Sequence, residues 1–208
     1  SSDLSPKFWD SLDDYNRKFV ICHEALHLIL YHGRRLKGKI PEIGNVAADV
    51  VINESLVQNF GFDRDQIKNS SDFCWYDTVF KDQKVDTERS MEYYYDELMK
   101  NVKQINIGMG SKGQPQSGKG NEKGQCKTVD MHGEFEDGQA MSDVTDAEQE
   151  KIDEKIADAC DALSHDELKD LKDAIEKKLD DETKKSLQAG SGVGGLFQVM
   201  NKIGRAHV

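Results

Sequence analysis

The first stretch of the chain in which apolar residues recur at three- and four-residue spacing covers residues 12–36. Its apolar positions include Phe19, Val20, Leu26, Ile29 and Leu30. Because residues three and four apart share one face of a helix, this pattern predicts a single helix from Leu12 to Leu36. The segment from Gly33 to Gly38 is expected to end it.

A second apolar stripe predicts a helix over residues 45–60. The members of this stripe are Val46, Val50, Val57 and Phe60. Gly61 follows directly, at a place where glycine commonly caps the C-terminus of a helix. Pro41 and Gly44 are expected to form the turn between the first helix and the second.

The pattern is less regular over residues 62–86, where aromatic and polar side chains are mixed without a clear period. We expect this segment to be partly buried and to have room for a short strand. A third helix is expected to begin near Thr87, whose hydroxyl can cap its N-terminus. The apolar residues of this helix are Met91, Tyr94, Tyr95 and Leu98.

The composition changes after residue 107. Residues 108–127 are rich in Gly, Ser and Lys, cannot offset the entropy cost of ordering, and are expected to form a flexible loop. Farther on, two helices are predicted between Asp143 and Gln188, joined near Ser164 and His165, and another helix at 196–203. We therefore expect a mainly α fold with little strand. It would comprise a metal-binding core (1–107), the loop (108–127) and a helical part (128–208) packed on the core.

Charge and cysteine content limit the classes of partner. The net charge is −11 and the pI is near 5.0, so nucleic acid is not an expected partner. No apolar run approaches the roughly 20 residues that cross a bilayer, so no membrane partner is expected either. The cysteines (Cys22, Cys74, Cys126 and Cys160) form no CxxC pair, which favours reduced thiols in a cytoplasmic protein. The acidic helices within 143–188 could dock a protein partner.

The strongest chemical signal is His23-Glu-Ala-Leu-His27 in the first predicted helix. Histidines at positions i and i+4 lie one turn apart on one face and can bind a single metal ion. Glu24 can reach a water molecule on that ion and take its proton, as a zinc hydrolase requires. The alternative is a helix with two ordinary histidines. Apolar neighbours such as Ile21 and Leu26 make a buried helix, and therefore a metal site, the better interpretation.

A zinc site needs a third protein ligand, and Asp49 is the best candidate. It lies in the otherwise apolar segment Asn45-Val-Ala-Ala-Asp-Val-Val-Ile-Asn53, where an unpaired charge is unfavourable. Asn53 follows one turn later on the same face. Glu54 competes, but it lies on another face of the helix. The alternatives for Asp49 are a buried salt bridge or a helix cap.

Histidine 132, in Asp130-Met-His132, is a second candidate near the metal. Its possible roles are a metal ligand in place of or in addition to Asp49, a donor to the oxyanion of the reaction, or a surface residue. For His132 we favour a role as the oxyanion donor or as a residue on the substrate side over a role as a surface residue. Tyr31 is expected to serve packing and His32 to lie on the surface.

Five segments, in this order, resemble a family of bacterial and phage metallopeptidases that often carry a C-terminal von Willebrand factor A-like domain. The segments are residues 4–12, 23–35, 45–53, 87–98 and 130–132. The resemblance implies a zincin-like metallopeptidase domain, here with additional C-terminal helices. It implies that His23 and His27 bind Zn²⁺ with Asp49 as third ligand, and that Glu24 is the base.

Two features of that family have no counterpart here: a strand ahead of Pro6-Lys-Phe8 and the von Willebrand factor A-like domain. We therefore expect the sequence to be part of a longer protein. The predicted function is zinc-dependent hydrolysis of peptide bonds in a protein or peptide substrate, with Glu24 and His132 as catalytic residues. The alternative is a non-catalytic regulatory module in which the metal stabilises a protein-binding scaffold.

Overall fold

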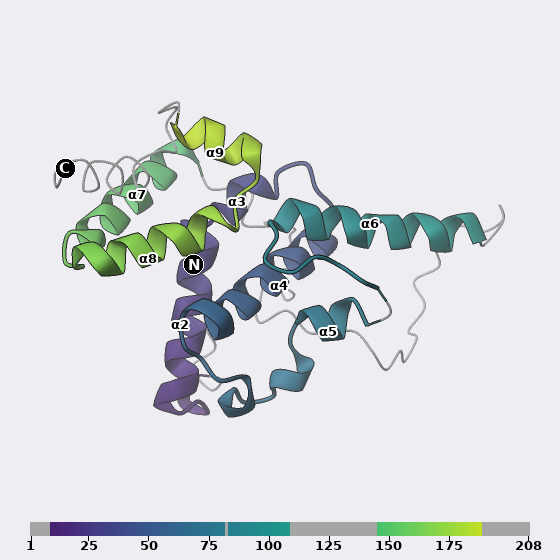
Figure 1. Cartoon of the computed structure of the whole chain (residues 1–208), viewed down its shortest axis with the longest axis horizontal. Coiled ribbons are helices and arrows are strands. Elements are labelled where there is room, and N and C mark those ends of the chain that lie inside the picture. The colour runs from purple at the N-terminus through teal and green to yellow at the C-terminus, as the bar shows by residue number, and fades with distance from the viewer. Residues whose placement is uncertain (1–8, 82, 109–144, 189–208) are drawn as a thin grey trace.

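Helices form the framework of the protein (Figure 1). The computed structural model describes residues 9–81, 83–108 and 145–188. Within these ranges the chain forms helices α2 to α9 and two short 3₁₀ turns, without an extended strand. The prediction of a mainly α fold is confirmed. The short strand expected within 62–86 was wrong for the residues described there, because they form η1 (Arg64–Gln66), η2 (Ser70–Asp72) and α5 (Tyr76–Val79).

The first predicted helix is broken in two. Helix α2 covers Asp14–Ile29, and a short helix α3 covers His32–Arg35. Between them Tyr31 adopts a left-handed conformation with φ of 56°. The prediction of one helix to Leu36 was wrong, because nothing in the local sequence marks this break. Gly33 lies inside α3 and does not end the first helix.

The second helix, α4, covers Pro41–Asn59 and begins earlier than predicted. Pro41 is not in a turn but in the first helical turn, where its missing N–H costs nothing. Gly44 is also helical, and a Cβ atom there would lie 2.4 Å from Leu36 Cδ2, so glycine leaves room for the Leu36 side chain. The prediction for Gly61 is confirmed, since its φ of +74° ends the helix in the conformation that glycine favours.

Helix α4 is the centre of the fold (Figure 1), and it packs against α2, α5 and α6. It is apolar on nearly all sides, which is typical of a helix surrounded by other elements. Its fully buried apolar residues are Ala47, Ala48, Val50, Val51, Ile52 and Leu56. The same core receives Trp75 from the segment before α5 and Tyr94 from α6.

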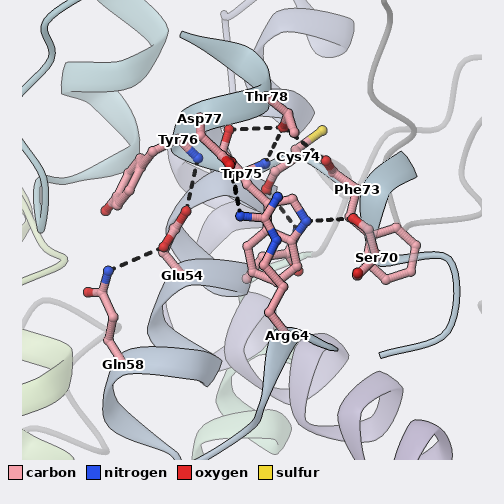
Figure 2. A network of polar contacts seen from close by, with 11 residues as sticks. Glu54, Gln58, Arg64, Ser70, Phe73, Cys74, Trp75, Tyr76, Asp77 and Thr78 are labelled. Carbon is pink, nitrogen blue, oxygen red and sulfur yellow. Dashed lines mark hydrogen bonds and ion pairs between the residues drawn. The ribbon is translucent and has the colours of Figure 1, made fainter. Parts of the chain in front are cut away.

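Polar contacts fasten the segment between α4 and α5 to the core (Figure 2). The Arg64 guanidinium lies 4.4 Å from the centre of the Trp75 ring and binds Asp77 at 3.0 Å. The Trp75 indole N–H donates to the Ser70 carbonyl at 2.6 Å. Glu54 of α4 accepts the backbone N–H of Tyr76 at 2.9 Å, which holds α5 on α4.

Helix α6 covers Met91–Gly108 and begins later than predicted. Thr87 is not its cap but lies in the preceding loop, where Glu88 has a φ of 57°. Tyrosine hydroxyls accept the backbone N–H groups of this loop: Tyr76 binds Glu88 at 3.0 Å and Tyr94 binds Arg89 at 3.1 Å. These tertiary contacts stabilise a loop where local sequence favours a helix start.

The C-terminal helices are α7 (Asp146–Cys160), α8 (His165–Glu176) and α9 (Asp181–Gln188). The predicted junction near Ser164 and His165 is confirmed, and the Ser164 side chain caps α8. A further break after α8 divides the second predicted helix in two. Four residues of this part belong to the same buried core as α4: Cys160, Leu168, Ile175 and Leu179. Except for Gly108, the predicted loop at 108–127 lies outside the described residues, as do the segments 128–135 and 196–203.

An ion pair between Arg35 and Glu92 joins α3 to α6. The pair is bidentate, with Nε–Oε1 and Nη2–Oε2 distances of 2.8 and 2.5 Å, and the Arg35 side chain is only 5% exposed. Arg35 also donates to the backbone carbonyls of Leu30 and Lys178.

We expect Arg35→Leu to lower the free energy of unfolding by about 3 kcal/mol, because it leaves buried acceptors without a donor. Urea denaturation measures this loss. In the control, Asp14→Asn breaks an exposed pair with Arg17 and should change stability by no more than about 0.5 kcal/mol. Equal urea midpoints for Arg35→Leu and the wild type would contradict the prediction.

Candidate metal centre

Helix α2 turns both histidines of the His23-Glu-Ala-Leu-His27 motif into the protein. His23 is 0% and His27 is 1% exposed, whereas Ile21 on the other side of the helix is 54% exposed. The Nε2 atoms of the two histidines lie 3.1 Å apart. The motif therefore faces the core, as predicted, although Ile21 does not contribute to its burial.

Asp49 of α4 lies opposite the two histidines and is fully buried. Its Oδ1 atom is 3.7 Å from His23 Nε2 and 3.4 Å from His27 Nε2. Of all His, Cys, Asp and Glu side chains in the described ranges, only His23, His27 and Asp49 come together as such a group, with ligand atoms within 4.8 Å of one another. The packing of α2 on α4 thus brings together the three residues predicted as metal ligands.

The geometry of the three ligand atoms fits a tetrahedral metal ion. Bonds of about 2.0–2.1 Å to a tetrahedral zinc ion place its ligand atoms about 3.3 Å apart. The observed separations are 3.1, 3.4 and 3.7 Å. Two imidazoles and a carboxylate are also a ligand set that divalent transition metals such as zinc accept. These three residues could therefore hold a metal ion with small adjustments of their side chains.

Asn53, one turn after Asp49 on α4, orients His23. The Asn53 Nδ2 group donates to the Cys74 carbonyl at 3.1 Å, which leaves its Oδ1 atom facing His23 Nδ1 at 3.0 Å. Since this oxygen can only accept, His23 carries its hydrogen on Nδ1. The lone pair of Nε2 is then directed toward His27 and Asp49, where a metal ion held by this group would lie.

His32 is the residue that the sequence analysis misplaced most. It was predicted on the surface, but it is 0% exposed, and its Nδ1 atom lies 3.1 Å from His27 Nδ1. Burial, followed by the neighbouring His27 and Arg35, lowers its pKa well below the usual histidine value, so the ring is neutral. A five-residue spacing is not a ligand spacing in a regular helix, so the sequence carried no signal for this contact.

The other predicted residues have different positions. Glu24 is half-buried on α2 beside His23. Glu54 binds the backbone of α5 and is not part of the metal group, and burial raises its pKa. Tyr31 is buried, as predicted for a packing residue. His132 lies outside the described residues, so its role stays a prediction.

We expect Asn53→Leu to weaken zinc binding roughly 10- to 100-fold, because outer partners of ligating histidines have effects of this size. Competition with a chromophoric chelator measures the affinity. The matched control is Asn59→Leu, an exposed position of the same helix, which should bind zinc as the wild type does. Equal affinities for the two variants would show that Asn53 does not orient the ligand.

A family model described as "Putative metallopeptidase domain" matches residues 3–206, almost the whole chain. No curated protein and no solved structure matches the chain, so the zincin-like fold stays a prediction. None of the described helices combines the length and the apolar character that crossing a bilayer requires.

Proposed function

The chain belongs to the family described as Putative metallopeptidase domain, and from this membership we propose that it is a zinc-dependent peptidase acting on a protein or peptide substrate. The observation that carries the proposal is the buried group of His23, His27 and Asp49. The distances between its ligand atoms are those expected around a tetrahedral metal ion. Its two histidines and Glu24 form the His-Glu-x-x-His motif that is typical of zinc hydrolases.

Zinc held by these residues would lower the pKa of a bound water molecule and polarise the carbonyl of the peptide bond. His23, His27 and Asp49 would supply three ligand atoms to the ion, which would leave it able to bind that water as well. In the proposed reaction Glu24 accepts a proton from the water as the water oxygen bonds to the carbonyl carbon, and Glu24 gives that proton to the amine nitrogen as the C–N bond breaks. His132 is proposed to donate a hydrogen bond to the oxygen that becomes negatively charged.

Metal content and peptide cleavage test the proposal together. The purified protein is expected to hold one equivalent of zinc and to cleave peptides in a proteome-derived pool. Removing zinc with a chelator should stop cleavage, and adding zinc back should restore it. A protein that binds no zinc would contradict the proposal. Zinc binding without cleavage of any peptide would favour the non-catalytic regulatory module instead.

A further inference from the structure

We propose that His32 is a positioning residue for the metal ligand His27. In this arrangement His32 Nδ1 accepts a hydrogen bond from the N–H at Nδ1 of His27, which keeps the lone pair of His27 Nε2 directed at the metal. The inference rests on the proposed function, because it assumes that His27 binds the ion.

The geometry of the two rings allows only one direction for this hydrogen bond when a metal is bound. The two Nδ1 atoms lie 3.1 Å apart, so one hydrogen lies between them. If His32 donated it, the neutral His27 ring would carry its own hydrogen on Nε2 and could not bind a metal through that atom. His27 must therefore be the donor and His32 the acceptor.

The left-handed turn at Tyr31 makes this contact possible. In an uninterrupted α-helix, a residue five positions after His27 would be rotated about 140° away from it around the axis. The φ of 56° at Tyr31 ends α2 and redirects the chain, so that His32 returns to the face of His27. A residue other than glycine keeps a left-handed backbone conformation only where its surroundings hold it. The surrounding residues can do so at Tyr31, because its side chain is buried, with 2% exposed.

The second ring nitrogen of His32, Nε2, also supports a role for His32 in positioning His27. His32 is fully buried, and among the described residues none makes a hydrogen bond to its Nε2 atom. A buried ring nitrogen without a partner is unfavourable, so packing alone would favour an apolar side chain at this position. The contact with His27 gives a reason for a histidine here.

Two variants of similar size separate positioning from packing. His32→Asn keeps an acceptor oxygen close to the place of Nδ1, whereas His32→Leu removes the acceptor. We expect His32→Leu to weaken zinc binding 10- to 100-fold in chelator competition and to alter the visible spectrum of the cobalt-substituted protein. His32→Asn should stay close to the wild type in both. Circular dichroism of the metal-free proteins checks that both variants fold.

Nuclear magnetic resonance of the wild-type protein tests the inference without a substitution. With zinc bound, long-range ¹H–¹⁵N spectra of the histidine rings should show the hydrogen of His27 on Nδ1 and that of His32 on Nε2. The inference is overturned if His32 carries its hydrogen on Nδ1, or if the Asn and Leu variants lose zinc affinity equally or not at all. Those results leave the proposed function standing, whereas a wild-type protein without zinc overturns both.

Discussion

Glu24→Gln is expected to bind zinc with wild-type affinity and to cleave peptides at least about 100-fold more slowly, because general acid–base groups contribute roughly 10²–10⁴-fold to rates. Glutamine has nearly the size of glutamate but cannot accept the proton of a zinc-bound water. Glu24 is adjacent to His23 but is not one of the three grouped ligands, so the substitution should leave the metal in place. Cleavage of a peptide pool, followed by mass spectrometry, measures the loss.

The matched control for this experiment is Glu42→Gln, which changes an exposed glutamate in the first turn of α4. It should cleave peptides at the wild-type rate. If Glu24→Gln also cleaves at the wild-type rate while holding zinc, Glu24 is not the base. If neither variant nor the wild type cleaves any peptide, the regulatory module becomes the better interpretation.

Asp49→Ala is expected to lose nearly all bound zinc. The free energy of zinc binding to a structural site with four ligands is roughly 10–16 kcal/mol, or about 3 kcal/mol for each ligand. Removing one ligand should therefore weaken binding by on the order of 100-fold or more. The stabilisation that zinc gives to the folded state should disappear with it, since ligand binding raises stability in proportion to the logarithm of the affinity.

Zinc per chain and the rise of the melting temperature on adding zinc measure both effects. The informative comparison is His132→Ala, because sequence alone left His132 as an alternative third ligand. This variant is expected to keep one equivalent of zinc and to cleave more slowly. The opposite result, with zinc lost from His132→Ala and retained by Asp49→Ala, would assign the third ligand to His132.

The metal site shows where prediction from sequence succeeds. The four-residue spacing of His23 and His27 depends only on the period of a helix, so the sequence fixes their common face. An unpaired carboxylate in an apolar stretch is unfavourable whichever element the helix packs against. For this reason the sequence alone identified Asp49 as the candidate third ligand. That the two helices bring these residues within 4.8 Å of one another is a property of the packing, and only the structure shows it.

By itself, the sequence determined the elements whose cause is local. These are the helical periods of α2 and α4, the left-handed end of α4 at Gly61, and the junction at Ser164 that its capping side chain marks. Each depends on residues within one or two turns of the feature. Local side chains and backbone preferences are enough to set them.

Only the tertiary structure decided the features that depend on contacts outside a single regular helix. Tyrosine hydroxyls hold the loop around Thr87 out of the helix, and Asn53 orients His23 through the Cys74 carbonyl, 21 residues away. The left-handed Tyr31 turns His32 from an expected surface position to the back of His27. The physical reason is that burial and long-range hydrogen bonds outweigh local preferences of about 1 kcal/mol or less for each residue.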